Sequence, residues 1–289
     1  MKRKYLSAFP EISMYYNKPN LKNFKKSVVA NGNALAPKSL NQNVYVFENT
    51  TQMDSVFNVF FHSYCNFIKF NEFCKLHSKD ELFFQSIEVN GSKNVTNYHN
   101  NRLIMLLKIG EIVEDTIHSK KNVGFYLSEL MGKINSLTMI IKCEICDFTQ
   151  TSNHNNILPS LKISIAILEK NNFVEILLNE LFKNHYACGK CNGSLQIQYN
   201  LNNYVSIDIE DQNLAIELCK IQQVLNYDSK EFVLAGVIEF EVCTSGLKKY
   251  TALCRSLQGF WNTKENIKRF KNITEKNSVK VAVIIYIQN

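Results

Sequence analysis

The chain has 289 residues, of which 45% are hydrophobic and 20% charged, with 4 prolines and 10 glycines. This composition excludes a disordered chain and indicates a folded protein that buries a full hydrophobic core. The formal net charge of +7 comes from scattered lysines that are dense only at 22–26 and 264–276. It therefore indicates solvated surface more than a nucleic-acid-binding stripe.

The start of the chain, Met1-Lys-Arg-Lys, is basic, but no unbroken apolar region follows it, so we expect no secretory signal. No stretch reaches the roughly 18 apolar residues that a membrane span needs. We therefore expect a cytoplasmic or nuclear protein without a membrane partner. In such a compartment, nine cysteines point to metal ligation or buried thiols rather than to a disulfide framework.

The first half of the chain reads as mostly helical. Residues 1–40 are polar and irregular, which predicts an extended N-terminal arm. Apolar residues then recur at helical spacing, which predicts one long, deeply buried helix over 53–75. Further helices are expected at 102–117 and 123–134, and a strand is expected at 137–143.

The second half changes character, because strand-like runs alternate with turn-forming residues. Strands are expected at 161–167, 194–199, 204–209, 232–243, 249–254 and 279–287, with one short helix at 173–184. A helical part followed by a mostly antiparallel β part predicts an α+β fold.

Two Cys-x-x-Cys pairs, Cys143/Cys146 and Cys188/Cys191, form the strongest chemical motif. Each pair presents two sulfurs to one metal ion, and zinc prefers four thiolates in a tetrahedron. Such a set has no open position, so the zinc is expected to be structural. The alternatives are two unrelated buried pairs or a redox motif, in which a second copy has no role. His185 is expected beside this site or on the surface rather than as a ligand.

Three segments, in order, resemble the ubiquitin-specific protease family. Residues 49–56, Asn-Thr-Thr-Gln-Met-Asp-Ser-Val, resemble the nucleophile motif Asn-Thr-Cys-Tyr-Met-Asn-Ser-Val. The cysteine pairs fall where the family has zinc-bearing fingers, and 201–209 is similar to its Leu-Pro-x-x-Leu strand. Residues 246–255 and Trp261 resemble its closing Gly-His-Tyr-Thr-Ala-x-x-Arg and Trp-Tyr-x-Phe-Asp-Asp. Asp54 and the compact length also resemble the related SUMO-isopeptidase branch.

This resemblance implies a papain-like cysteine-protease fold of the ubiquitin-specific protease type within residues 41–289. The helical thumb would lie at about 41–135, the zinc-bearing fingers at about 136–200 and the antiparallel β palm at about 201–289. In the family, ubiquitin sits between these parts and its C-terminal tail lies in a channel. Gln52 and Tyr250 would line that channel.

The same resemblance places degenerate residues at the catalytic positions. Thr51 stands for the nucleophile, and a threonine hydroxyl needs a chain-terminal amine as base, which an internal residue lacks. Lys249 stands for the histidine and is a poor base at pH 7. Val46 stands for the oxyanion donor and has no side-chain donor, so only Glu265 keeps the type of its position. We therefore expect a pseudo-enzyme.

A displaced catalytic pair is the first alternative, with Cys65 or Cys74 as nucleophile and His62 or His77 as base. His62 and Cys65 lie on an apolar helix, where burial in the core is the more common role. The favoured hypothesis is an inactive domain that binds ubiquitin, SUMO or another protein. A zinc-containing nucleic-acid-binding protein is the other alternative, suggested by the +7 charge.

Overall fold

The computed structural model describes most of the chain beyond its N-terminal segment. The described residues are 38–40, 42–92, 95–113, 116–118, 121–132, 134–157, 165–170, 172–181, 187–244, 246, 248–266, 269–273 and 276–289. Most of the expected N-terminal arm lies outside them, although its last residues, Lys38–Leu40, form strand β1. No helix among the described residues is both long and apolar enough to span a membrane.

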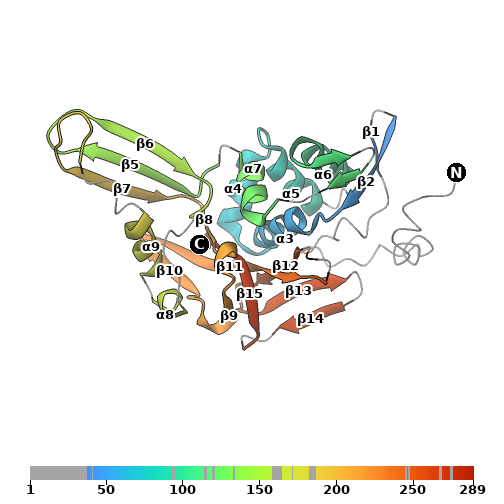
Figure 1. Cartoon of the computed structure of the whole chain (residues 1–289). Helices are drawn as coiled ribbons and strands as arrows, with labels where there is room; N and C mark the ends of the chain where they lie inside the picture. The colour runs from blue at the N-terminus through green and yellow to red at the C-terminus, as the bar shows by residue number, and fades with distance from the viewer. Residues whose placement is uncertain are drawn as a thin grey trace.

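A group of helices forms one layer of the molecule (Figure 1). These helices are α3 (Thr51–Asn66), α4 (Ile68–His77), α5 (Leu82–Gly91), α6 (Val95–Ile109) and α7 (Val123–Met131). Beside them lies a small four-stranded sheet in the order β1-β2-β4-β3, whose further strands are β2 (Asn43–Glu48), β3 (Glu111–Val113) and β4 (Thr116–His118).

An eight-stranded antiparallel sheet forms the second layer, in the order β14-β13-β12-β11-β15-β8, with β10 and β9 paired at its sides. Its strands are β8 (Tyr204–Asp208), β9 (Ala215–Glu217), β10 (Val224–Tyr227), β11 (Lys230–Val242), β12 (Lys248–Arg255), β13 (Trp261–Asn266), β14 (Arg269–Ile273) and β15 (Ser278–Gln288). Short 3-10 turns η3 (Glu210–Gln212) and η4 (Leu218–Lys220) connect some of them.

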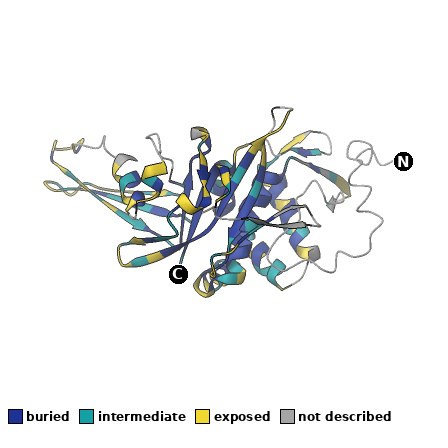
Figure 2. Ribbon diagram, turned by 90° about the horizontal axis from the view of Figure 1, so that it is seen from below, coloured by how far each residue is buried: buried dark blue, intermediate teal, exposed yellow. Residues whose placement is uncertain are grey.

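The central strands are buried on both faces (Figure 2). One face packs against α3 to α7 in a core that includes Phe57, Phe60 and Ile238. The other face packs against the short helix α9 (Phe173–Leu181) in a second core that includes Leu177 and Val237. Because alternate residues of a strand point to opposite faces, β11 contributes to both cores.

A three-stranded sheet, which we call the arm, projects from this body (Figure 1). Its order is β6-β5-β7, with strands β5 (Leu137–Cys143), β6 (Thr149–His154) and β7 (Leu195–Leu201). Leu137, Met139 and Ile141 are buried on one face of β5, while every residue of β6 is exposed or half-buried. The chain crosses the outer end of the arm twice, once after β5 and once before β7.

The α+β class and most predicted elements are confirmed. The strand at 137–143 and the helix starting at 123 are observed, and the strands predicted from residue 194 onward appear within a few residues. The helix predicted at 173–184 is seen as α9 in its described part.

Three predicted elements are wrong in part. The helix expected over 53–75 is two helices, because Phe67 is extended with φ −115° and the Asn66 amide binds the His62 carbonyl oxygen at 2.7 Å. The helix expected at 102–117 ends at Ile109, and β-branched residues beyond Gly110 form strands β3 and β4. In the region predicted as strand 161–167, the described part is the short helix α8 (Ile165–Leu168).

A buried ion pair fixes the start of α3. Arg102 on α6, 1% exposed, donates from Nε to Asp54 Oδ1 at 2.8 Å and from Nη2 to both Asp54 Oδ2 and Thr50 Oγ1, each at 2.9 Å. Thr50 Oγ1 in turn donates to Asp54 Oδ2 at 2.8 Å. The guanidinium also lies over the Phe47 ring, 5.1 Å from its centre. This network joins β2, α3 and α6 immediately before Thr51.

We expect Arg102→Met to lower the free energy of unfolding by about 3–5 kcal/mol, because it leaves the Asp54 carboxylate buried without its partner. Urea denaturation measures the change. Lys220→Met is the matched control, because Lys220 and Glu169 form an exposed pair at 2.8 Å that should contribute less than about 1 kcal/mol. Equal losses in the two variants would contradict a special role for the buried pair.

Candidate functional site

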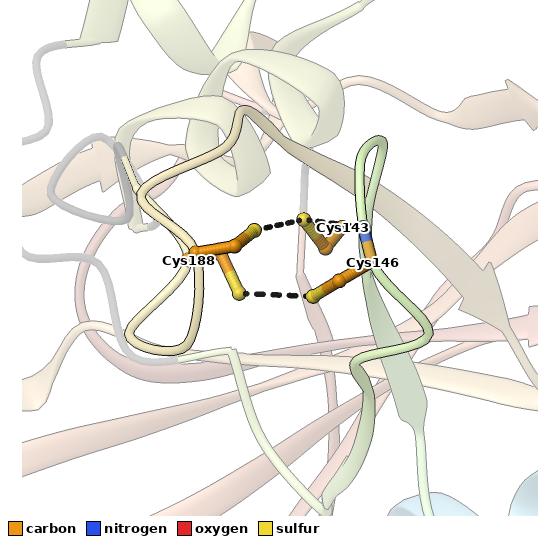
Figure 3. Close-up of side chains that lie close together, drawn as sticks. Cys143, Cys146 and Cys188 are labelled. Atoms are coloured by element: carbon orange, nitrogen blue, oxygen red, sulfur yellow. Dashed lines mark hydrogen bonds between the residues drawn. The ribbon is translucent and has the colours of Figure 1, made fainter.

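The four cysteines of the two pairs come together at the outer end of the arm. Cys143 is the last residue of β5, Cys146 lies in the following turn, and Cys188 and Cys191 lie in the turn before β7. Their sulfurs all lie within 4.8 Å of one another. Cys143 Sγ is 3.4 Å from Cys191 Sγ, and Cys146 Sγ is 3.7 Å from Cys188 Sγ. Figure 3 shows Cys143 and Cys146 facing Cys188 across the gap between the two turns.

This donor set fits one metal ion. Four sulfurs at about 2.3 Å from a tetrahedral zinc ion lie about 3.8 Å apart, close to the two separations above. Backbone N–H groups of Ile145 and Cys146 donate to Cys143 Sγ, each at 3.4 Å, and lower the pKa of this thiol to about 6. Thiolates are the ligating form of cysteine. The cysteines are therefore positioned to bind one ion, as the spacing predicted.

The residues at the predicted catalytic positions lie where α3 meets β12. Thr51 is the first residue of α3 and is 5% exposed. Its Oγ1 accepts from the Tyr250 backbone N–H at 3.2 Å and donates to Gln52 Oε1 at 3.3 Å. Gln52 and Tyr250 are each 4% exposed, so both predicted channel residues are packed against this point.

The two other positions are on neighbouring strands. Lys249 is exposed on β12, opposite Glu241 of β11, one residue before Tyr250. Glu265 belongs to β13, which pairs with β12, but its side chain lies outside the described part of the structure, as does that of Val46 on β2. His185 also lies outside it. The structure therefore brings Thr51, Gln52 and Tyr250 together and places Lys249 next to them.

A close approach of α3 to the sheet sets this arrangement. At Gly236 on β11, an added Cβ would lie 3.1 Å from a Val59 methyl group on α3 and 2.7 Å from the Leu253 carbonyl oxygen on β12. A side chain at this position would push α3 away from the sheet. Glycine thus permits the helix to lie against β11 and β12.

An acidic cluster beside Tyr250 was not predicted. Glu210, 2% exposed, follows β8, and its Oε1 accepts from Tyr250 OH at 2.7 Å and from Lys248 Nζ at 2.6 Å. Burial and this hydrogen bond raise the pKa of the Tyr250 phenol, so it remains a donor. Burial also raises the pKa of Asp208 to about 6, and the carboxylates of Glu210 and Asp211 add to the rise. The sequence feature that could have predicted this cluster is the group of acidic residues at the end of the buried strand β8.

Two members of the alternative Cys/His sets, His62 and Cys74, are buried in the core. Cys65 is exposed, whereas His62 on the same helix is 3% exposed and burial lowers its pKa to about 4. Cys74 is fully buried, and burial raises the pKa of its thiol well above the usual value. His77 packs its ring against Phe73, 4.6 Å between centres. The surroundings of His62 and Cys74 are typical of core residues.

Comparison with known proteins supports the fold alone. No protein-family model matches the chain, and no curated protein matches it significantly. A structure of the SAGA DUB module Ubp8/Sgf11/Sus1/Sgf73 bound to monoubiquitin is 14% identical with a TM-score of 0.50, covering 98% of this chain and 75% of that one. Another Ubp8-Sgf11-Sgf73-Sus1 module structure is 14% identical with a TM-score of 0.50, covering 100% and 75%.

An essential yeast splicing factor has a similar structure, 11% identical with a TM-score of 0.51, and the match covers 88% of this chain and 73% of that chain. Together these neighbours confirm the predicted fold, a mixed helical and antiparallel architecture of the ubiquitin-specific protease type. The cysteine cluster lies in the region of this chain that corresponds to the predicted fingers.

We expect Cys188→Ser to abolish stoichiometric metal binding and to unfold the outer end of the arm, because structural metal binding contributes directly to folding free energy. Elemental analysis should give one ion per chain for the unmodified protein and a small fraction of that for the variant. Cys219→Ser is the control, since Cys219 is exposed and lies outside the cluster. Unchanged metal content and melting in Cys188→Ser would refute the site.

We expect the buried His62 ring to make folding sensitive to acid. Its folded pKa of about 4 lies below the unfolded value, so between these values the unfolded chain binds a proton that the folded chain does not. The contribution of His62 to the free energy of unfolding is therefore fully present above pH 6.5, and it falls by about 3 kcal/mol as the pH drops towards 4. His62→Leu should therefore have a flatter stability profile over this interval. If the free energy of unfolding, measured by urea denaturation, depended on pH in the same way in both proteins, the assignment would be contradicted.

Proposed function

We propose that this chain is a catalytically inactive domain of the ubiquitin-specific protease type that binds ubiquitin or a SUMO-like modifier. The observation that carries the proposal is the state of Thr51. In this fold, the start of the buried helix α3 is the nucleophile position by resemblance, and the hydroxyl found there is buried and hydrogen-bonded to Tyr250 and Gln52.

The chemistry of these residues supports inactivity. A threonine hydroxyl attacks a carbonyl only after a neighbouring base takes its proton. The histidine position carries Lys249, an exposed side chain with no imidazole to take that proton. Thr51 Oγ1 also accepts a hydrogen bond from the Tyr250 backbone N–H, which lowers the electron density on this oxygen and makes it a weaker nucleophile. Glu265 would be left without an imidazole to orient.

The fold supports a polypeptide partner. One similar structure holds monoubiquitin in a complex. On this chain, we assign the thumb to α3–α7, the palm to the eight-stranded sheet and the fingers to the arm. Replacement of the nucleophilic cysteine by threonine changes one side chain at the end of the channel. The large surfaces of palm, fingers and thumb do not depend on that side chain and are left for binding.

We propose zinc as the ion at Cys143, Cys146, Cys188 and Cys191. Four thiolates suit zinc better than harder cations such as magnesium or calcium, which prefer oxygen ligands. A closed set of four sulfurs leaves no position for water or substrate, so the ion would be structural. It would hold together two turns that residues 147–187 separate in sequence.

A protein-interaction scaffold without ubiquitin affinity is the second candidate. The observation that favours it is the similar structure of the yeast splicing factor, which shows that this fold is found outside the DUB module as well.

The test pairs binding with cleavage. We expect the purified chain to bind monoubiquitin or SUMO in calorimetric titration and to release no fluorophore from either modifier carrying a C-terminal fluorogenic amide. The reason is that the Thr51 hydroxyl is hydrogen-bonded, among the described residues, to Gln52 and the Tyr250 backbone, and neither is a general base. Thr51→Ala should bind within about twofold of the unmodified protein, since the buried hydroxyl already makes its hydrogen bonds within the chain, to Tyr250 and Gln52.

Cleavage by the unmodified protein would overturn the assignment of Thr51 and Lys249 and direct the search to another Cys/His pair. Absence of both binding and cleavage would favour the scaffold candidate.

A further inference from the structure

Strand β6 forms an open edge of the arm. The sheet order β6-β5-β7 leaves β6 paired on one side, and no described strand pairs with its other side. This side of the arm is turned away from α9 (Figure 1). Every residue of β6 is exposed or half-buried, so an incoming strand can reach its backbone. Such an edge presents unpaired N–H and C=O groups, which are a template for pairing with another chain.

The end strands of the two other sheets are protected by charge. Each of them contains at least one charged residue, and these residues are Lys38 in β1, Glu111 in β3, Asp208 in β8, and Arg269 and Lys271 in β14. Charged side chains on an edge strand oppose pairing with another chain. The sequence of β6, Thr-Gln-Thr-Ser-Asn-His, contains no Asp, Glu, Lys or Arg, no proline and no glycine. It therefore lacks the features that normally block an edge.

The opposite edge strand of the arm, β7, also lacks charge, but the body of the molecule covers it. Tyr227 OH of β10 donates to the Tyr199 carbonyl oxygen at 3.5 Å. Lys230 Nζ of β11 donates to the Leu201 carbonyl oxygen at 2.7 Å. Two backbone acceptors of β7 are thus already occupied, and β6 is the edge of the arm that is available to a partner.

The hydrogen bonds to β5 determine which residues of β6 face the open edge. The Cys143 N–H donates to the Phe148 carbonyl oxygen at 3.0 Å, just before β6 begins. Along an antiparallel pair, residues alternate between bonding to the partner strand and pointing away from it. The residues of β6 that direct their backbone N–H and C=O groups to the open edge are therefore Thr149, Thr151 and Asn153.

We propose that β6 pairs with β6 of a second copy of this chain, antiparallel about a two-fold axis at Thr151. In this register, Thr151 lies opposite the partner's Thr151, and Thr149 lies opposite the partner's Asn153. All three edge-facing residues then exchange both backbone bonds with the residue opposite, which gives about six hydrogen bonds. A two-fold axis lets the same patch serve both copies. The two arms would form one continuous sheet.

The side chains of β6 complement themselves in this register. The Thr151 hydroxyls meet across the axis, and the Thr149 hydroxyl meets the partner's Asn153 amide. Gln150 lies opposite the partner's Ser152 on the other face. Each pair combines hydroxyl or amide donors and acceptors, and such cross-strand pairs stabilise antiparallel sheets. No like charges meet, because β6 has no charged residue, so a second copy fits this edge better than a charged segment of another protein.

This pairing goes beyond the proposed function and does not depend on it, because it uses the edge of the arm and leaves both faces uncovered. The paired surface is small, so we expect a weak dimer with a dissociation constant on the order of tens of micromolar. Sedimentation equilibrium of the full chain over a wide concentration range measures this constant.

Charge substitutions at Thr151 test the register. Thr151→Lys should weaken dimerisation at least about tenfold, because two ammonium groups would lie opposite each other at the axis. Thr151→Glu should have the same effect. An equimolar mixture of the two variants should dimerise again, because lysine then lies opposite glutamate. This rescue requires the residue at 151 to lie against its own copy.

Gln198→Lys is the matched control. Gln198 is exposed on β7, on the same rung of the sheet as Thr151, because both residues pair with Ile140 of β5. It should change the dissociation constant by less than about twofold. The melting temperatures of all three variants should stay near that of the unmodified protein, because each substituted side chain is exposed.

A monomer at every concentration would overturn the proposal and leave the edge to a strand of another protein. A dimer that Thr151→Lys does not weaken, or variants that do not associate when mixed, would overturn the pairing about Thr151. Equal weakening by Gln198→Lys would also overturn it, because the contact would then lie on the face of the arm rather than on its edge.

Discussion

The ion pair between Asp54 and Arg102 is the constraint on which the centre of this molecule depends. Both side chains are almost completely buried, and Thr50 closes a three-residue network with them. The network holds the end of β2 and the first turn of α3 against α6. Because Thr51 follows Thr50 directly, the same contacts place its hydroxyl against the Tyr250 backbone. From there, the Tyr250 phenol leads to Glu210, so one chain of polar contacts runs from the helical layer into the sheet.

Much of the fold follows from local patterns. Strands such as β11 and β15 are long, apolar and rich in β-branched residues, so the sequence predicts them within a few residues. The break between α3 and α4 was missed, because it depends on the side-chain amides of Asn66 and Asn71 binding carbonyl groups in the last turns of α3. Strands β3 and β4 were read as helix because each has three residues, too few to show alternation.

The sequence predicted those parts of the site whose residues form a short local motif, and it missed those that depend on partners distant in the chain. The cysteine cluster was found because each Cys-x-x-Cys turn carries its own geometry, and the structure then brings the two turns together. Glu210 was missed because its role arises from Tyr250 and Lys248, which are distant in sequence. Arg102 gave a usable signal: a charge on the apolar stripe of α6 requires a buried acid, and Asp54 occupies the apolar stripe of α3.

The central claim is that the surfaces around Thr51 and along the arm bind a modifier without processing it. Hydrogen exchange of the full chain, measured by mass spectrometry with and without saturating monoubiquitin, tests this claim most directly. The account predicts slower exchange at 204–212, at 246–255 and along the strands of the arm, with the mass of monoubiquitin unchanged after incubation. Unaltered exchange in these segments under saturating monoubiquitin, or protection confined to the opposite face around α9, would contradict it.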